Sequence, residues 1–138
     1  LKSFTDKSGW WESGDLGKKI RIKNKIYIEI IGRGDNAFSS GGEIVFPDLI
    51  SERLKKFTNT NKLPFEKFII SKLEDKYWGN KFEIIIKLKN NTKKSEIKSS
   101  LNLLKEYSEM WSKHERPLKW DVYNKTQTKN HIRNWKNI

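Results

Sequence analysis

The sequence contains no cysteine among its 138 residues, which excludes a disulfide framework, a thiolate metal site and a cysteine nucleophile. No apolar run approaches the roughly 20 residues that a membrane-spanning helix needs, and the N-terminal residues lack the apolar core of a signal peptide. Both absences favour a cytoplasmic protein with no membrane partner. The two histidines, His114 and His131, lack the partners that a metal site or a serine–histidine pair requires. We therefore expect no metal site.

Acidic residues are scarce relative to basic ones, since 17 Asp and Glu stand against 29 Lys and Arg, a net charge of +12. A lysine-rich surface with six tryptophans can bind phosphates and stack bases, so a basic nucleic-acid-binding module is one hypothesis. The lysines are nevertheless spread along the chain among Asn and Ile and form no single block. We expect solvated basic faces and no nucleic-acid partner, with a positive potential that attracts small polyanions.

The first part of the chain has the period of a β-hairpin. Between residues 19 and 31 apolar residues keep an even spacing around Asn24, the expected turn; they are Ile20, Ile22, Ile26, Ile28 and Ile30. This pattern predicts a hairpin or a pair of half-buried strands. Gly32 and Gly34 end the pattern, and residues 39–42 form a second flexible stretch.

The remainder predicts helices and strands in mixed order. Pro47 suits the first turn of an amphipathic helix over 47–57, and a second helix begins at Thr92 or Ser95, with one apolar stripe formed by Ile97, Leu101, Leu104 and Trp111. Strands are predicted at 68–70, at 82–88 and at 118–122 after Pro117. In the second of these strands Phe82, Ile84, Ile86 and Leu88 share one face. We therefore predict an α+β domain, a small sheet of about three strands with helices packed on it, preceded by a β-hairpin.

Two segments near the hairpin carry a specific pattern. Residues 9–17 read GWWESGDLG and residues 32–47 read GRGDNAFSSGGEIVFP. They resemble two consecutive motifs of the adenylate-forming superfamily, the acyl-CoA synthetases and their relatives. In that family the first reads Gly-Trp/Tyr-x-x-Thr/Ser-Gly-Asp, and the second reads Gly-Arg-x-Asp followed by Ser-Gly-Gly-Glu and an aromatic-Pro. Residues 75–80, DKYWGN, are similar to the family's Asp-x-x-Trp-Gly-Glu element, which joins two strands.

The resemblance implies roles for three charged residues. Asp15 would hold the ribose hydroxyls of AMP, and Arg33 would contact the nucleotide, since a guanidinium can fork onto phosphate or ribose oxygens. Asp35 would be the hinge between a large N-terminal domain and a small mobile one. The plain alternatives are a turn aspartate at position 15 and a solvent-exposed Arg-Gly-Asp loop at 33–35.

The resemblance also assigns a loop and a catalytic lysine. Ser40, Gly41, Gly42 and Glu43 match the loop that lines the CoA channel during thioester formation. The family ends with Thr/Ser-Gly-Lys, whose lysine offsets the charge of the reacting carboxylate and α-phosphate. Residues 125–135 read KTQTKNHIRNW, so an alignment without a gap places Asn130 on that lysine, and a shift of one residue places Lys129 there. We take Lys129 as the catalytic residue.

Taken as a whole, the resemblance implies a piece of a larger enzyme. Residues 1–31 would be the terminal strands of a large N-terminal adenylating domain, and residues 32–138 the mobile C-terminal lid, with the hinge near residue 35. The implied enzyme is an acid–CoA ligase (AMP-forming), most similar to the o-succinylbenzoate–CoA ligases of menaquinone and phylloquinone biosynthesis. ATP, CoA and a small carboxylic acid would be its substrates, with Mg²⁺ accompanying ATP but not ligated by this segment. The missing N-terminal domain would be the main partner, and the 138 residues alone would be inactive. A stand-alone, degenerate lid used for protein interaction is the alternative.

Overall fold

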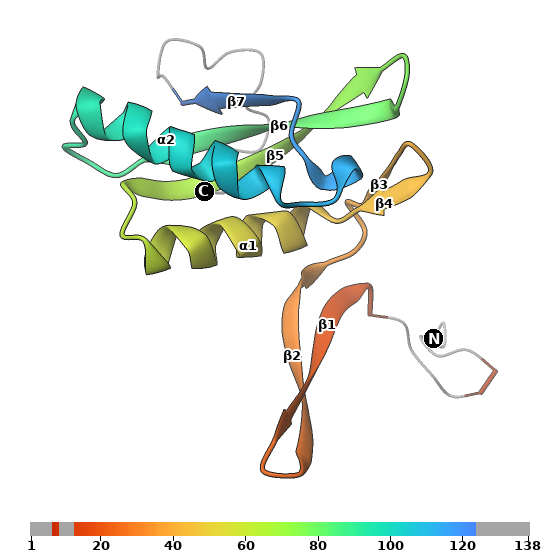
Figure 1. Ribbon diagram of the computed structural model, residues 1–138. Helices are drawn as coiled ribbons and strands as arrows, with labels where there is room; N and C mark the ends of the chain where they lie inside the picture. The colour runs from red at the N-terminus through yellow and green to blue at the C-terminus, as the bar shows by residue number, and fades with distance from the viewer. Residues whose placement is uncertain (1–6, 9–12, 124–138) are drawn as a thin grey trace, which may run out of the picture.

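The computed structural model describes residues 7–8 and 13–123 (Figure 1). In chain order the elements are β1 (Asp15–Ile22), β2 (Lys25–Arg33), β3 (Phe38–Ser40), β4 (Glu43–Val45), α1 (Pro47–Thr60), β5 (Phe65–Asp75), β6 (Gly79–Leu88), α2 (Lys94–Glu109), the 3₁₀ turn η1 (Lys113–Glu115) and β7 (Lys119–Val122). The predicted α+β class is confirmed. The body of the molecule comprises β3 to β7 with both α-helices, and the β1–β2 hairpin extends away from it (Figure 1).

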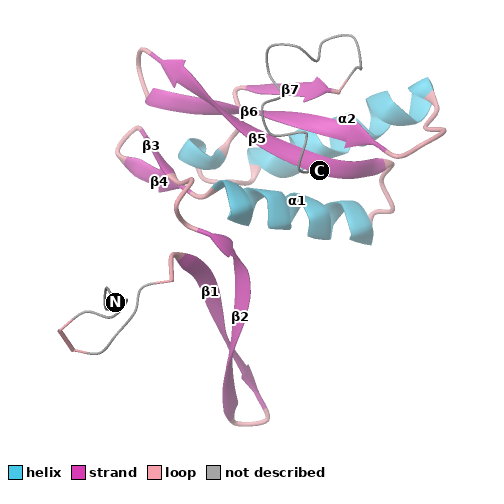
Figure 2. Cartoon of the chain, turned by 180° about the vertical axis from the view of Figure 1, so that it is seen from behind, coloured by secondary structure: helices cyan, strands magenta, loops and turns pink. Residues whose placement is uncertain are grey.

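A three-stranded sheet forms the centre of the body. Its strand order is β5-β6-β7, with β5 antiparallel and β7 parallel to β6. A parallel neighbour requires a crossover connection, and α2 provides it. Both helices cover the same face of the sheet, which Figure 2 shows from the opposite side with the strands in front.

The core lies between this sheet face and the helices. Phe82, Ile84 and Ile86 of β6 are fully buried, as are Leu54 of α1 and Leu104 of α2. The prediction that the three β6 residues share one face is therefore confirmed, because strand residues two apart point to the same side. Trp111 also joins this core although α2 has already ended at Glu109.

The predicted start of the second helix is wrong in its capping residue. The N-cap is Lys93, whose backbone N–H donates to the Glu96 carboxylate at 3.3 Å. The Thr92 hydroxyl instead donates to the Lys89 carbonyl at 2.6 Å, and Ser95 lies within the helix. The carboxylate of Glu96, at the third helical position, accepts the hydrogen bond of the N-cap amide, as the glutamate of a capping box does, and the helix begins without a Ser or Thr cap.

The β1–β2 hairpin is confirmed, and Ile20 of β1 is partly buried, but Ile28 and Ile30 of β2 are more exposed than the half-buried strands predicted from the sequence. Lys23 and Asn24 form the turn, with φ of 44° and 62°, as a two-residue turn of type I′ requires. This turn pairs Ile20 with Tyr27, so the isoleucines of β1 and those of β2 point to opposite faces. Side chains of β2 are strongly exposed: Ile26 at 51%, Ile28 at 73% and Ile30 at 64%.

Within residues 7–8 and 13–123, no helix combines the length and apolar character needed to cross a membrane.

Candidate functional site

The two sequence motifs meet where the hairpin joins the body. The backbone N–H of Gly34 donates to the Gly14 carbonyl at 2.8 Å, which holds the chain before β1 beside the segment that follows β2. An open cleft of about 440 Å³ lies at this junction; its described lining is Ser13, Gly14, Asp15, Leu16, Gly34, Asp35 and Phe46. This volume is within the range of pockets that hold small molecules. Residues 9–12 of the first motif lie outside the described residues.

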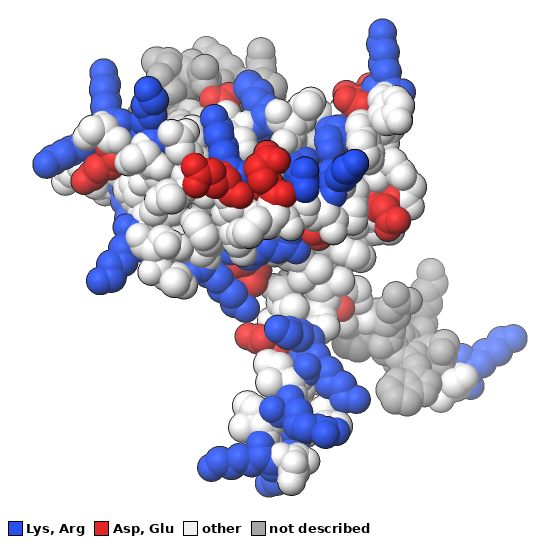
Figure 3. All heavy atoms as spheres, viewed as in Figure 1, with Lys and Arg blue, Asp and Glu red and all other residues white. Residues whose placement is uncertain are grey.

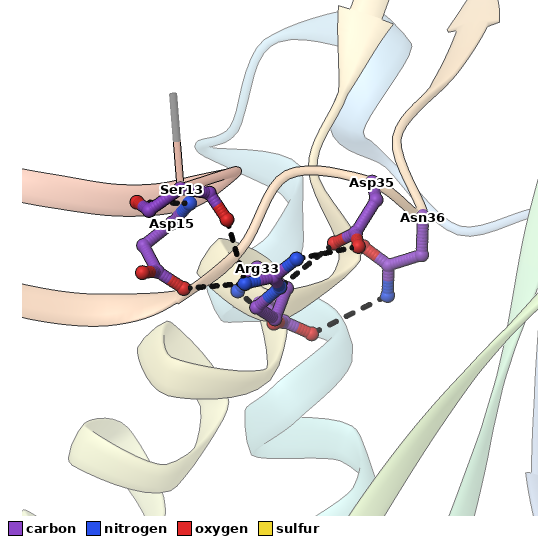
Figure 4. Close-up of polar contacts among 6 residues, drawn as sticks. Ser13, Asp15, Arg33, Asp35 and Asn36 are labelled. Carbon is purple, nitrogen blue, oxygen red and sulfur yellow. Dashed lines mark hydrogen bonds and ion pairs between the residues drawn. The ribbon is translucent and has the colours of Figure 1, made fainter. Parts of the chain in front are cut away.

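Arg33 connects the two aspartates that the sequence singled out (Figure 4). Its Nη1 donates to Asp15 Oδ1 at 2.9 Å and to the Ser13 carbonyl at 2.8 Å. Its Nη2 and Nε donate to the two carboxylate oxygens of Asp35, at 2.8 and 3.1 Å. Figure 4 shows the guanidinium lying between the two carboxylates. The bidentate pair with Asp35 has the geometry that guanidinium and carboxylate groups favour.

These contacts set the protonation of both aspartates. A hydrogen bond from Ser13, followed by the hydrogen bond from Arg33, lowers the pKa of Asp15 below its ordinary value. The hydrogen bond from Arg33 is the largest cause of the lowered pKa of Asp35. The pKa of Arg33 is raised, with the Asp35 hydrogen bond as the largest cause. Both carboxylates are therefore ionised at neutral pH and can accept hydrogen bonds from hydroxyl groups, but Asp15 already uses one oxygen to bind Arg33.

Asp48, in the first turn of α1, is a residue of this region that the sequence reasoning missed. The backbone N–H of Arg33 donates to Asp48 Oδ2 at 2.5 Å, and the Asn36 side-chain amide contacts Oδ1 at 3.4 Å. The available signal was an acidic residue directly after Pro47, at a helix start where negative charge is favoured. That signal predicts a helix terminus and gives no indication of a contact with β2.

Ser40, Gly41, Gly42 and Glu43 form the tight turn and flanks of the β3–β4 hairpin, so the flexible stretch expected here is an ordered turn. Gly41 and Gly42 have φ of +59° and +87°, which suits residues without a Cβ. The Gly41 N–H donates to the Trp78 carbonyl at 2.8 Å, and a Cβ on Gly41 would overlap the Trp78 ring. The β5–β6 turn therefore supports this loop, and Trp78 has a structural role.

Lys81 adds a positive charge beside that loop. It is almost fully buried, its Nζ lies 4.7 Å from the centre of the Trp78 ring, and it donates to the Lys113 carbonyl at 3.3 Å. Burial lowers the pKa of Lys81. The contact with Trp78 has cation–π geometry, so Lys81 fixes the ring that supports Gly41.

Some of the predicted site residues lie outside the described residues or outside the cleft. Lys129 and its alternative Asn130 lie outside the described residues, as does His131, so their positions relative to the cleft stay predictions. The loop of Ser40 to Glu43 contributes no residue to the described lining of the Asp15 cleft. In the described part of the chain, no cluster of three or more His, Cys, Asp or Glu could hold a metal ion.

The fold is similar to one part of several larger proteins of known structure. An Escherichia coli MenE structure with a bound analogue of OSB-AMS matches 95% of this chain at 20% identity, with a TM-score of 0.65. The o-succinylbenzoate CoA synthetase (MenE) of Bacillus subtilis, in complex with the acyl-adenylate OSB-AMP, matches 89% at 22% identity with a TM-score of 0.56. ATP-bound MatB of Rhodopseudomonas palustris matches 88% at 18% identity with a TM-score of 0.58.

The match covers only part of each of these proteins. This chain spans 26%, 23% and 22% of their respective lengths. No protein-family model and no curated protein matches the sequence significantly. At sequence identities of 18–22%, the similarity to these structures establishes the fold alone.

Proposed function

We propose that this chain is the C-terminal part of an AMP-forming acid–CoA ligase. The observation that carries the proposal is the meeting of Asp15, Arg33 and Asp35 at one cleft, within a fold shared with acyl-CoA ligases over most of the chain. Residues 1–31 belong to the large N-terminal domain in this proposal, and residues 32–138 form the lid that turns about Asp35. The enzyme acts in the cytoplasm, where both of its soluble cosubstrates, ATP and CoA, are available.

The reaction proceeds in two steps. A carboxylate oxygen of the acid attacks the α-phosphorus of ATP, so that an acyl-adenylate forms and pyrophosphate leaves. The CoA thiol then attacks the acyl carbon, a thioester forms, and AMP leaves. Mg²⁺ accompanies ATP in the first step, and the described residues of this chain do not ligate it.

Each proposed site residue has a chemical task in these steps. Asp15 accepts hydrogen bonds from the ribose hydroxyls of the adenylate, and Arg33 must move away from Asp15 to leave that oxygen free. Lys129 offsets the negative charge that gathers between carboxylate and α-phosphate. The Gly41–Gly42 turn, supported by Trp78, lines the path of the CoA thiol, because a backbone without side chains permits close approach of a ligand.

The exposed isoleucines of β2 support the proposal that a larger domain is missing. Ile28 and Ile30 are exposed by 73% and 64% on a strand whose cross-strand neighbours Lys19 and Gly17 cannot cover them. Apolar side chains gathered on one face are typical of a surface that contacts another part of a protein. In the proposed enzyme the N-terminal domain covers them.

The acid substrate is proposed from likeness alone. Two of the structures compared above are MenE proteins with o-succinylbenzoyl-adenylate or an analogue bound. We propose o-succinylbenzoate as the acid and menaquinone or phylloquinone biosynthesis as the pathway. Other small carboxylic acids are the comparison substrates for the assay.

The decisive experiment measures ATP–pyrophosphate exchange by the complete polypeptide that contains these residues, with o-succinylbenzoate as the acid. We expect Lys129→Ala to lower exchange about 100-fold or more, the scale of losing one stabilising group at the transition state. The same variant should still convert preformed acyl-adenylate to thioester. Asn130→Ala is the matched control and should exchange normally; the reverse result would assign the catalytic position to residue 130. Absence of exchange with every acid tested would refute the ligase proposal.

A nucleic-acid interaction has one observation in its favour. Basic side chains gather along the β1–β2 hairpin (Figure 3), where Lys18, Lys19, Arg21, Lys23, Lys25 and Arg33 stand against two acidic residues, Asp15 and Glu29. Such a module predicts oligonucleotide binding that weakens steeply with salt. Binding of single-stranded oligonucleotides that is lost on Lys23→Ala and Lys25→Ala would favour this second candidate.

A further inference from the structure

Asp48 touches the chain on both sides of the proposed hinge residue, Asp35. Its Oδ2 accepts the backbone N–H of Arg33, the last residue of β2, and its Oδ1 accepts the side-chain amide of Asn36. Asp48 itself belongs to α1, which packs in the body of the molecule and is also the body element in contact with β2. One carboxylate therefore connects the body to the hairpin across residue 35.

The approach of Asp48 to β2 depends on a glycine in the strand. A Cβ built on Gly32 would lie 2.5 Å from Asp48 Oδ2 and 2.6 Å from its Cβ. No other side chain fits at position 32 without separating β2 from α1. The absence of a side chain at position 32 thus makes room for the side chain at position 48 in this orientation of hairpin and body.

Arg33 is consequently fixed at both ends. Asp15 and Asp35 bind its side chain, while Asp48 binds its backbone amide. A rotation about residue 35 that moves the body relative to β2 must break the bond between Asp48 and the Arg33 amide. The side-chain contacts between Arg33 and Asp15 lie entirely on the hairpin side of residue 35 and can persist through such a rotation.

We propose that Asp48 is a positioning residue that holds the body in this one orientation relative to the hairpin, and that its release accompanies each turn of the lid. The hydrogen bonds of Asp48 are features of the structure whether or not the chain is part of an enzyme. The consequence for catalysis rests on the proposed function, in which each of the two reaction steps uses its own lid orientation. Loss of Asp48 should then shift the balance between the two orientations.

The absence of cysteine allows a direct test of the orientation. Spin labels on Lys23→Cys, in the hairpin turn, and on Lys98→Cys, on the exposed side of α2, report the distance between hairpin and body by pulsed electron paramagnetic resonance. We expect one narrow distance distribution for the otherwise unchanged chain and a broad or shifted one for Asp48→Ala. Gly32→Ala, which pushes the same contact apart from the other side, should broaden the distribution as well.

Two variants control this measurement. Glu52→Ala removes the same charge one turn further along α1, where Glu52 forms an ion pair with Lys56 of the same helix at 3.8 Å, and should leave the distribution unchanged. Asp48→Asn keeps a carbonyl oxygen as acceptor and should remain closer to the unchanged chain than Asp48→Ala. Circular dichroism confirms that each variant is folded. A distribution for Asp48→Ala that equals that of Glu52→Ala would overturn the proposal; if Asp48→Ala does not fold, the same outcome for Gly32→Ala would overturn it.

The catalytic consequence is measured in the complete polypeptide. The ratio of ATP–pyrophosphate exchange to thioester formation from preformed adenylate should change about tenfold or more in Asp48→Ala, the scale of one hydrogen bond to a charged group, and should not change in Glu52→Ala. If neither half-reaction occurs in the unchanged enzyme, the proposed function fails while the distance result stands. If both occur and the ratio is unchanged, Asp48 has no influence on lid turning.

Discussion

Arg33 is shared by two carboxylates with different proposed tasks. It binds Asp15, the proposed ribose acceptor, and Asp35, the proposed hinge. All three side chains lie near solvent, so each ion pair contributes little to the free energy of unfolding. Their importance is that the Arg33 guanidinium already binds Asp15 Oδ1, an oxygen that the proposed contact with the ribose would need.

The lowered pKa values of Asp15 and Asp35 give a prediction that can be checked by titration. We expect carboxyl carbon resonances of both residues to titrate below about 3.9, the usual midpoint of aspartate. Because each pKa is lower in the folded chain, the interactions are complete above that midpoint and are lost as pH falls through the folded pKa. Between pH 5 and 8 the network should not change.

Substitution of the guanidinium should reverse this effect. Arg33→Met is expected to move the Asp35 midpoint up toward 3.9, with a smaller rise for Asp15, whose Ser13 hydrogen bond remains. Lys119→Met, which removes a cation that binds Asp121 in β7, should move neither. Unchanged midpoints in Arg33→Met would show that the ion pairs do not form in solution.

At the scale of elements, the β3–β4 turn owes its position to the β5–β6 turn. Asn80 donates to the Ser39 carbonyl at 3.0 Å, and Asp75 Oδ1 accepts the backbone N–H groups of Tyr77 and Trp78. The second turn is thereby ordered by its own aspartate and presents Trp78 to Gly41. The two hairpins therefore form one unit, as the proposed movement of the lid and its loop would require.

Two adjacent glycines offer a matched comparison of this packing. Gly41 and Gly42 both have positive φ, but only Gly41 faces a side chain, since the space beside Gly42 is open. Gly42→Ala should lower the free energy of unfolding by about 1–2 kcal/mol, the cost of the left-handed backbone alone. Gly41→Ala should cost at least about 1 kcal/mol more, because the added methyl group meets the Trp78 ring.

Urea unfolding of both variants measures the difference. Introducing Trp78→Ala into each of them should reduce the gap between Gly41→Ala and Gly42→Ala, as expected for residues that interact. Equal costs for the two glycine variants in the presence of Trp78 would contradict the close packing of Gly41.

At the scale of the whole molecule, apolar residues are divided between a closed core and an open hairpin. Ile84 and Ile86 of β6 are fully buried beneath the helices, whereas Ile28 of β2 is 73% exposed. The two groups have the same side chain and comparable strand positions. Only the first contributes to the stability of the 138-residue chain.

This division predicts that substitutions of a core isoleucine and of a hairpin isoleucine differ in their effect on the free energy of unfolding. Ile84→Ala should lower the free energy of unfolding of this chain by about 2–5 kcal/mol, and Ile28→Ser should change it by no more than about 0.5 kcal/mol. In the complete polypeptide Ile28→Ser should become clearly destabilising, because the proposed N-terminal domain covers that face. Thermal and urea unfolding of both lengths provide the comparison; an equally neutral effect in both would place β2 at the surface of the whole enzyme.

The local sequence was sufficient to predict those elements that are specified by turn residues and by the spacing of apolar side chains. Alternating isoleucines around Asn24 predicted the β1–β2 hairpin, Pro47 marked the start of α1, and the apolar period of residues 82–88 predicted β6 and its buried face. The motifs that point to Asp15, Arg33 and Asp35 were also visible, because glycines and charges at fixed spacing are properties of the chain itself. Turn chemistry and side-chain period act over a few residues, so these predictions required no knowledge of distant contacts.

Tertiary structure decided which elements and side chains are in contact. The two-residue turn placed Ile20 and Ile22 of β1 on the face opposite to Ile26, Ile28 and Ile30 of β2, and the latter three remain exposed in the described chain. The pair of Arg53 with Glu115, at 3.1 and 3.2 Å, joins α1 to η1 across 62 positions. Asp48 reads as an ordinary helix start, yet it binds the amide of Arg33 across the proposed hinge. The sequence by itself determined the elements and the chemical groups of the site, while the packing of α1 against β2 decided which of those groups meet, because contacts between distant residues exist only once the chain has folded.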